Sequence, residues 1–293
     1  MMLLQESFQN KERSGMLYLV PTPIGNLDDI TMRALKILKS ADMIAAEDTR
    51  QTLKLCNHFE IQTSLVSYHE HNKTVSGEKI LKALKEGANV ALVSDAGTPA
   101  VSDPGYELVV SCVEEGVPVI PLPGSNAAVT SLIASGLPTD HFLFYGFLPR
   151  SKKEKEAALE EISQFPYTLI FYESPFRIKD TLAAAFKTLG NRKAAFAREL
   201  TKRYETFVRG DLERLIEHLS NQDIKGECCL IIEGSKESAD TETNEWWREL
   251  TIGEHVDHYV KVKALSSKEA IKKVAKERQQ PKRDIYQAYH VDN

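Results

Sequence analysis

The stretch that decides the fold, residues 94–105, reads Ser-Asp-Ala-Gly-Thr-Pro-Ala-Val-Ser-Asp-Pro-Gly. It follows an apolar run, Asn89 to Val93, of the kind that forms a buried parallel strand, and it precedes a helical pattern from Glu107 to Glu115. Turn-forming residues are therefore crowded where the carboxyl end of a strand meets the next helix. In open α/β sheets, ligands bind outside the carboxyl ends of the strands. The stretch predicts an α/β fold with a ligand cleft at this edge.

Two other loops have the same character. Residues 21–26 read Pro-Thr-Pro-Ile-Gly-Asn after the first predicted strand, and residues 121–126 read Pro-Leu-Pro-Gly-Ser-Asn after a later one. The first loop lacks the three glycines of GxGxxG, and the chain contains no GxxxxGK[ST], so a dinucleotide or nucleoside triphosphate is disfavoured. We expect the three loops to converge on one sheet edge and to form a binding cleft.

Each loop also has a plain structural interpretation. Asp28 or Asp29, Asp103 and Ser125 are each able to cap the helix that follows their loop. Asp95, at the end of its strand, either contacts a ligand or braces the loop. The residues alone leave these alternatives open.

The order of apolar and amphipathic segments predicts the domains. Short apolar runs alternate with helical patterns from Met16 to Ala134, which indicates a mostly parallel sheet covered by helices on both faces. A second α/β unit follows, in which the closely spaced runs at 193–198 and 206–209 predict an antiparallel pair and a mixed sheet. The predicted boundaries are a flexible tail at 1–14, α/β domains at 15–138 and 139–234, a linker at 235–248 and a basic helical module at 249–293.

Net charge, hydropathy and cysteine content limit the classes of protein to which the chain can belong. The chain of 293 residues has a net charge of -5, and its mean hydropathy of -0.32 is that of an ordinary soluble globular protein. We expect a cytoplasmic protein with no membrane contact. The four cysteines lack metal-ligand spacing, so we expect reduced core thiols and no metal site. The segment from Lys261 to Arg283 contains nine basic residues and only two acidic ones. This excess of positive charge indicates either an RNA-binding surface or a solvated helix face.

Charged residues at the predicted strand ends supply candidates for catalysis and RNA binding. A carboxylate in a cleft is able to act as a general base, although a single charged residue at a strand end is more often a cap or a surface pair. The catalytic candidates are Glu47, Asp95, Glu173 and Glu199. The candidates for RNA contacts are Arg50, Arg177, Arg198, Lys202, Lys272, Lys273 and Lys276.

Taken together, these loops resemble the tetrapyrrole methylase superfamily over Met16 to about Gly234. Within it, the chain resembles the branch of small-subunit ribosomal RNA 2'-O-ribose cytidine methyltransferases. The motifs that carry the resemblance are Leu19–Leu27, Ala46–Arg50, Ser94–Gly105 and Leu122–Asn126, strengthened by residues 172–177 and 197–202. The basic C-terminal module resembles the small helical domain of that branch.

The resemblance implies two unlike α/β domains with S-adenosylmethionine (SAM) held in the cleft between them. It implies cofactor contacts from Pro23, Gly25, Asn26, Asp95, Ala96, Gly97, Thr98, Pro99, Ser102, Ser125, Asn126 and Ala127. The implied acceptor is the ribose 2'-hydroxyl of a cytidine in 16S ribosomal RNA, within a ribosomal particle, and the implied assembly is a homodimer. Two alternatives remain, a methylase of a tetrapyrrole or other small acceptor and a non-catalytic RNA-binding assembly factor. The basic tail and the Pro-Thr-Pro loop argue against the former.

Overall fold

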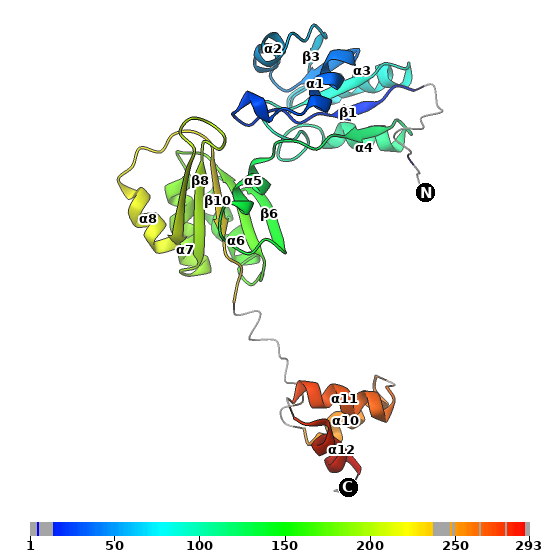
Figure 1. Ribbon diagram of the computed structural model, residues 1–293, viewed down its shortest axis with the longest axis vertical. Coiled ribbons are helices and arrows are strands. Elements are labelled where there is room, and N and C mark those ends of the chain that lie inside the picture. Colours follow the sequence, from blue (N-terminus) through cyan, green and yellow to red (C-terminus); the bar gives the residue numbers. More distant parts are fainter. Residues whose placement is uncertain are drawn as a thin grey trace. The chain divides into compact units, whose positions relative to one another are not determined.

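The computed structural model describes residues 5, 14–236, 247, 250–263, 265–278 and 280–290. The chain forms two compact units, Met1–Ser235 and Lys236–Asn293 (Figure 1). The predicted N-terminal tail and most of the predicted linker lie outside the described residues.

The first unit begins with the predicted parallel sheet. Its five strands lie in the order β3-β2-β4-β1-β5, and every pairing is parallel. The strands are β1 (Leu17–Leu19), β2 (Met43–Ala46), β3 (Leu65–Ser67), β4 (Val90–Val93) and β5 (Val119–Pro121). The connecting elements are η1 (Leu27–Asp29), α1 (Met32–Ser40), α2 (Thr49–His58), α3 (Lys73–Lys85), α4 (Tyr106–Glu114) and α5 (Ala127–Ile133).

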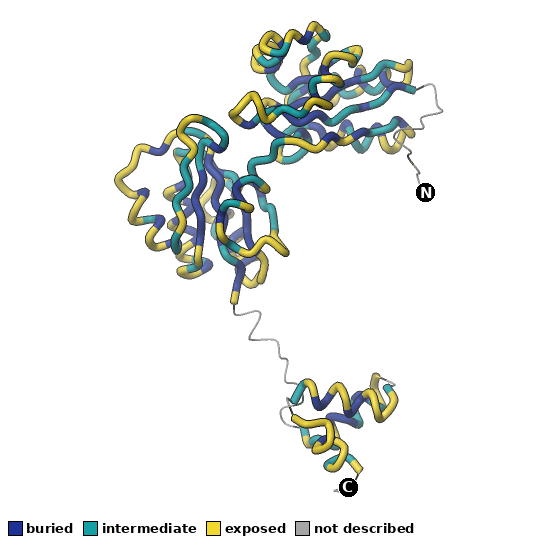
Figure 2. The backbone as a smooth tube through the Cα atoms, in the orientation of Figure 1, coloured by how far each residue is buried: buried dark blue, intermediate teal, exposed yellow. Residues whose placement is uncertain are grey.

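Both faces of this sheet are buried, because its helices divide between them. Ala34 and Leu38 of α1 and Cys56 of α2 pack on one face, against the strand residue Ile44 among others. On the other face, α3 and α4 pack through Ile80, Leu84, Leu108 and Cys112. Figure 2 shows the strands as mostly buried and the outer helix surfaces as exposed. The doubly wound arrangement brings the carboxyl ends of the strands to one open edge.

A second, mixed sheet follows in the order β6-β7-β10-β8-β9. Only β6 and β7 pair in parallel, and β8 and β9 form the predicted antiparallel pair. The strands are β6 (Phe142–Phe147), β7 (Thr168–Glu173), β8 (Lys193–Arg198), β9 (Thr206–Asp211) and β10 (Cys228–Ile232). Its helices are α6 (Lys152–Glu161), α7 (Ile178–Leu189) and α8 (Leu212–Ser220). The prediction of two unlike α/β domains is confirmed.

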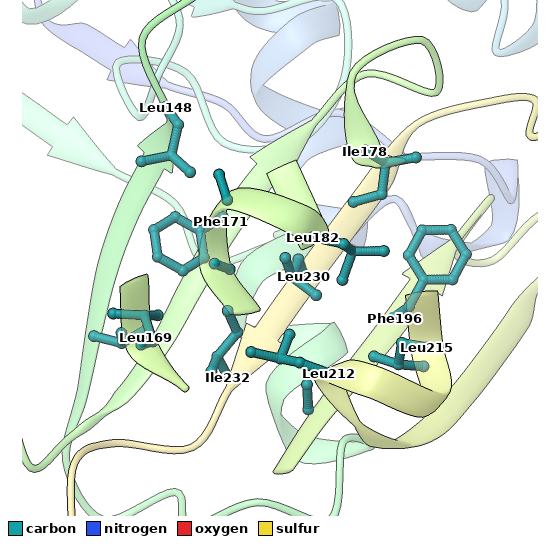
Figure 3. Close-up of a cluster of buried hydrophobic side chains, with 14 of the residues drawn as sticks. Leu148, Leu169, Phe171, Ile178, Leu182, Phe196, Leu212, Leu215, Leu230 and Ile232 are labelled. Atoms are coloured by element: carbon teal, nitrogen blue, oxygen red, sulfur yellow. The ribbon is translucent and has the colours of Figure 1, made fainter. Parts of the chain in front are cut away.

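The second sheet is covered on both faces, but by helices from different parts of the chain. Figure 3 shows Leu182 of α7 and Leu212 of α8 packed over the β10 residue Leu230 on one face. The other face receives α5, whose Ala128 and Leu132 share a core with strand residues of the second sheet. Helix α5, which follows the first sheet in the chain, therefore packs on the second sheet, and its first turn lies where the two α/β halves meet.

The second unit is a small three-helix module with its own core. It contains α10 (Ile252–Lys261), α11 (Ser267–Glu277) and α12 (Lys282–His290), all within the predicted helical module. Its core includes Val256, Ile271 and Ile285. The described residues contain no helix with the length and apolar character that a bilayer crossing requires. The four cysteines are all in the first unit, buried and without disulfides, as the sequence predicted.

Candidate functional site

The three loops predicted to converge are joined by hydrogen bonds. Thr22 N–H donates to Gly97 O (2.9 Å), and Gly97 N–H donates back to Thr22 O (3.0 Å). The Thr98 hydroxyl donates to Ser125 O at 3.0 Å, which ties the loop after β4 to the loop after β5. Gly97 has a φ of +81°, where a side chain would be strained. The sequence prediction of one convergent edge is therefore confirmed.

These loops form one side of a cavity of about 670 Å³, and the second sheet and its loops form the other. This volume lies within the range of about 300–1,000 Å³ typical of small-molecule sites. Seven of the residues expected to contact cofactor line it: Asp95, Ala96, Gly97, Thr98, Ser102, Asn126 and Ala127. The other five, Pro23, Gly25, Asn26, Pro99 and Ser125, belong to the same loops but are not on the cavity wall.

Gly25 has a packing role in this arrangement. A Cβ atom at this position would lie 2.5 Å from Lys202 Cγ and 2.8 Å from Leu200 O, so a loop of the second α/β half crosses directly over it. The neighbouring N–H of Asn26 donates to Thr201 Oγ1 at 2.9 Å. The first loop thus clamps the loop after β8 and holds the two sides of the cavity together.

Backbone strain is concentrated around the same cavity. Ala100, Ser102, Glu199 and Thr201 all have positive φ values between 50° and 64°, a region that residues with a Cβ rarely adopt. They belong to the loops after β4 and β8, which face each other across the cavity. Strained conformations that persist in folded proteins are typical of ligand-binding sites.

Three carboxylates, Glu47, Asp95 and Asp103, line the first side of the cavity. Burial, with the neighbouring Glu47 second, raises the pKa of Asp103 to about 7, although a hydrogen bond from Ser94 favours its ionised form. Burial likewise raises the pKa of Glu47 and that of Asp95. Asp95 also accepts from Asp48 N–H at 3.0 Å, so it braces the loop after β2 as well as lining the cavity.

The alternative role as helix caps is not adopted by the residues named for it. The cap of α4 is Gly105, which offers no side chain, so Asp103 is free to face the cavity. Asn26 caps η1 and Thr31 caps α1, in place of Asp28 or Asp29. The cap of α5 is Asn126, whose side chain accepts from Val129 N–H, and not Ser125.

Glu173 differs from the other three catalytic candidates. It contributes to the cavity wall, yet its side chain is fully buried in a hydrogen-bonded network. Its carboxylate accepts from Thr181 Oγ1 (2.7 Å) and from Ser174 N–H (2.8 Å), and lies 3.3 Å from Arg177 Nη2. Buried Lys155 in turn donates to Thr181. These contacts make Glu173 a structural brace for the loop after β7.

The cationic candidates are dispersed. Lys202 lines the cavity, where it pairs with Glu199 (2.9 Å) and Glu227 (3.2 Å). Arg50 is exposed and pairs with Asp48 at 2.8 Å, whereas Arg177 donates to the backbone oxygens of Leu148 and Pro149. Arg198 is half-buried at the end of β8. Lys272, Lys273 and Lys276 are exposed on α11 of the separate helical module.

Sequence reasoning missed much of the second side of the cavity. Phe147 and Tyr172 line it from β6 and β7, and Gly226, Glu227 and Cys229 line it near β10. The Tyr172 hydroxyl accepts from Ala128 N–H at 3.1 Å, and burial raises the pKa of Tyr172 to about 12. The strand-end motifs at 172–177 and 197–202, which contain Glu173, Glu199 and Lys202, were the signals in the sequence that pointed to this wall.

Comparison with known proteins agrees with this architecture. Residues 16–216 match the family model of tetrapyrrole (corrin/porphyrin) methylases. The chain is 58% identical to the ribosomal RNA small subunit methyltransferase I of Halalkalibacterium halodurans, over 99% of this chain and 100% of that one. It is 55% identical to the Bacillus subtilis protein of the same name, over 99% of both.

A solved structure of diphthine synthase has a similar fold. It superposes with a TM-score of 0.59 at 15% identity, over 75% of this chain and 90% of that one. The loops, the cavity between two unlike sheets and the full-length relatives agree with one another. The chain therefore belongs to the tetrapyrrole methylase family, as a methyltransferase of the group whose members are named ribosomal RNA small subunit methyltransferase I.

Proposed function

We propose that this protein transfers a methyl group from SAM to the ribose 2'-hydroxyl of a cytidine in small-subunit (16S) ribosomal RNA. The observation that carries the proposal is 58% identity over the full chain to a ribosomal RNA small subunit methyltransferase. The cavity supports it, because it combines a small-molecule volume with loops from both α/β halves. Its methyl donor is SAM, as the sequence resemblance implied.

The residues of the cavity fit this cofactor. SAM carries a positive sulfonium, and Glu47, Asp95 and Asp103 place carboxyl groups on the cavity wall whose ionised forms a cation favours. The residues that would hold it are Asp95, Ala96, Gly97, Thr98, Ser102, Asn126 and Ala127 on the wall, with Pro23, Gly25, Asn26, Pro99 and Ser125 shaping the loops. When bound, SAM supplies an activated methyl group for an in-line displacement.

The contribution of the protein is chiefly positioning. Well-oriented groups react as if at about 10⁵–10⁸ M, whereas a general base adds roughly 10²–10⁴-fold. The hydrogen-bonded loops after β1, β4 and β5 provide a fixed wall for this purpose. Proton removal from the acceptor hydroxyl falls to Glu47, Asp95, Glu199 or the newly found Asp103, since the carboxylate of Glu173 is engaged elsewhere.

The remaining parts of the proposal concern domains and partners. We infer α/β domains at 15–138 and 139–234, a linker at 235–248 and a helical module at 249–293 that contacts RNA through Lys272, Lys273 and Lys276. Exposure of these lysines supports the contact. Arg50 and Arg198 would contribute outside the cavity wall, and Lys202 would contribute from the wall, where it pairs with Glu199 and Glu227. The acceptor RNA is part of a ribosomal particle, and the enzyme is a cytoplasmic homodimer.

The test is transfer of labelled methyl from SAM into small-subunit ribosomal particles and into free ribosomal RNA. A 2'-O-methyl group blocks alkaline cleavage at its nucleotide, so label in an alkali-resistant dinucleotide is the expected result. Label in a small acceptor, or SAM binding without transfer to either RNA, would favour the tetrapyrrole methylase or the non-catalytic alternative.

Amide variants of the carboxylates identify the base. Glu47→Gln, Asp95→Asn, Asp103→Asn and Glu199→Gln are compared at saturating SAM, with exposed Asp28→Asn as the control. We expect one of the four to lose at least tenfold in turnover. Four near-normal variants would mean that positioning alone accounts for the rate.

Removal of residues 237–293 tests the RNA contacts of the module. The truncated protein is expected to bind RNA more weakly and with a shallower dependence on salt, because fewer cations meet phosphates. Its SAM affinity should stay unchanged. Unaltered RNA binding would leave the module without a role in substrate recognition.

A further inference from the structure

Two phenylalanines are exposed at one edge of the cavity. Phe147, the last residue of β6, lines the cavity and is 55% exposed. Phe176 is 92% exposed, in the loop directly after the cavity-lining residues Ser174 and Pro175. Single exposed apolar residues are common on protein surfaces, but two aromatic rings beside one cavity are a clustered feature.

The backbone around these rings is fixed. Arg177, next to Phe176, donates to Leu148 O (2.6 Å) and Pro149 O (3.0 Å), directly after Phe147. The carboxylate of the buried Glu173 lies 3.3 Å from Nη2 of the same arginine. Phe147 also makes an edge-to-face contact with Tyr172, with 5.7 Å between ring centroids. Both rings are therefore presented from one braced junction, which reduces the entropy lost when something binds to them.

The charge of the cavity wall makes these rings important for an RNA substrate. Besides the buried Glu173, its described lining residues include Glu47, Asp95, Asp103, Glu199 and Glu227, against the single lysine Lys202. Phosphates are repelled by such a wall. Close approach of RNA at the cavity must then come from its uncharged parts, the bases and the ribose. Aromatic rings bind unpaired bases by stacking, which needs no cation.

We propose that Phe147 and Phe176 form a stacking shelf for unpaired RNA bases at or beside the nucleotide whose ribose enters the cavity. The proposal rests on the proposed function, since it requires RNA as the substrate. The shelf recognises an unstacked single-stranded segment and positions it. The rings have no part in the chemistry of transfer.

The experiment compares Phe147→Ala and Phe176→Ala with matched controls on the same elements. Phe142 begins the strand that Phe147 ends and is 44% exposed, and Phe165 lies in the loop before β7 and is 40% exposed. Phe142→Ala and Phe165→Ala therefore remove comparable rings at the opposite end of the sheet. The KM for small-subunit particles at saturating SAM, the Kd for SAM by calorimetry and the sedimentation coefficient are measured for each variant.

Loss of one stacked base is expected to raise the KM for RNA by roughly tenfold, at unchanged kcat, unchanged SAM affinity and unchanged sedimentation. Phe176→Tyr, which keeps the ring, should restore the wild-type KM, and Phe176→Leu should not. The two control variants should behave as wild type.

Other outcomes overturn the shelf. If neither Phe147→Ala nor Phe176→Ala changes the KM for RNA, the rings do not bind RNA bases. If the variants lose SAM affinity together with RNA affinity, the rings belong to the cofactor site. A change in sedimentation would make them part of an interface between copies of the chain. Failure of the proposed function itself is recognised separately, because the wild-type protein would then transfer no label to RNA.

Discussion

Replacing Asp103 by Asn should stabilise the protein at every pH above the ordinary pKa of an aspartate, and not below it. The carboxyl lies among Glu47 and Asp95 in a partly buried wall, which raises its pKa from the ordinary 3.8 to about 7. A difference of that size corresponds to about 4 kcal/mol of unfolding free energy. Solvent reaches part of the group, so we expect about 1–2 kcal/mol.

The sign follows from proton binding. Between pH 3.8 and about 7, the folded protein keeps the Asp103 proton that the unfolded chain has released. Stability therefore falls as the pH rises through this window, and the contribution is fully present only below it. Asn cannot ionise, so the variant loses this dependence. At about pH 3.5, below the pKa of the unfolded chain, the two proteins should be close in stability, and at pH 8 the variant should be more stable.

Urea unfolding followed by circular dichroism at both pH values measures how the difference in stability between the variant and the wild-type protein changes with pH. The midpoint is the quantity to compare, with exposed Asp28→Asn as the control for loss of a surface charge. A gain at pH 8 that is absent at about pH 3.5 supports the reasoning. An equal gain at both values, or none at either, would refute the claim that Asp103 is held near neutral pKa by its surroundings.

Three further changes test other parts of the structure. Glu173→Gln should lower the free energy of unfolding by about 2 kcal/mol, because Arg177 loses its buried carboxylate partner. Chemical denaturation measures this loss, and an unchanged midpoint would mean that the ion pair does not stabilise the loop after β7. Gly25→Ala should weaken SAM binding in calorimetry, since the added Cβ would lie 2.5 Å from Lys202 Cγ and push the two loops apart. Wild-type affinity in this variant would mean that the close contact between the two loops is not needed for SAM binding. The helical module should lose thermal stability as pH falls below 6.5, because burial lowers the pKa of His255 in the folded state. Thermal melts of the protein at several pH values measure this trend, and His255→Gln should lack it.

The sequence predicted the fold well where local pattern and burial agree. The run from Asn89 to Val93 became β4, which is buried along its whole length, and the mixed second sheet followed from the spacing of two strands. Helix α3 begins at Lys73, although Thr74 to Gly77 carry little helical periodicity, so local pattern alone does not locate its first turn.

The first side of the site was predicted almost completely and the second side only through Glu173, Glu199 and Lys202, for a physical reason. Loops at the carboxyl ends of parallel strands are fixed by topology, so the loops carrying Gly97 and Asn126 could be expected to meet. The other wall depends on how the second sheet packs on α5, and nothing local encodes this contact. Caps failed for a related reason, since Ser125 and Asn126 are both suitable residues and the backbone conformation decides between them.

The acidic wall has a consequence for how the site distinguishes cofactor from product. SAM is a sulfonium cation, and the product left after methyl transfer is a neutral sulfide of otherwise similar shape. An opposite charge favours ionised Asp103, so the preference for SAM should grow as pH rises through about 7. We expect the ratio of the two dissociation constants to change roughly fivefold between pH 6 and pH 8, which corresponds to about 1 kcal/mol. Calorimetry with both ligands measures the ratio, and Asp103→Asn should flatten it. A constant ratio in the wild-type protein would mean that the carboxylates do not sense the cofactor charge, and that their role lies with the acceptor hydroxyl alone.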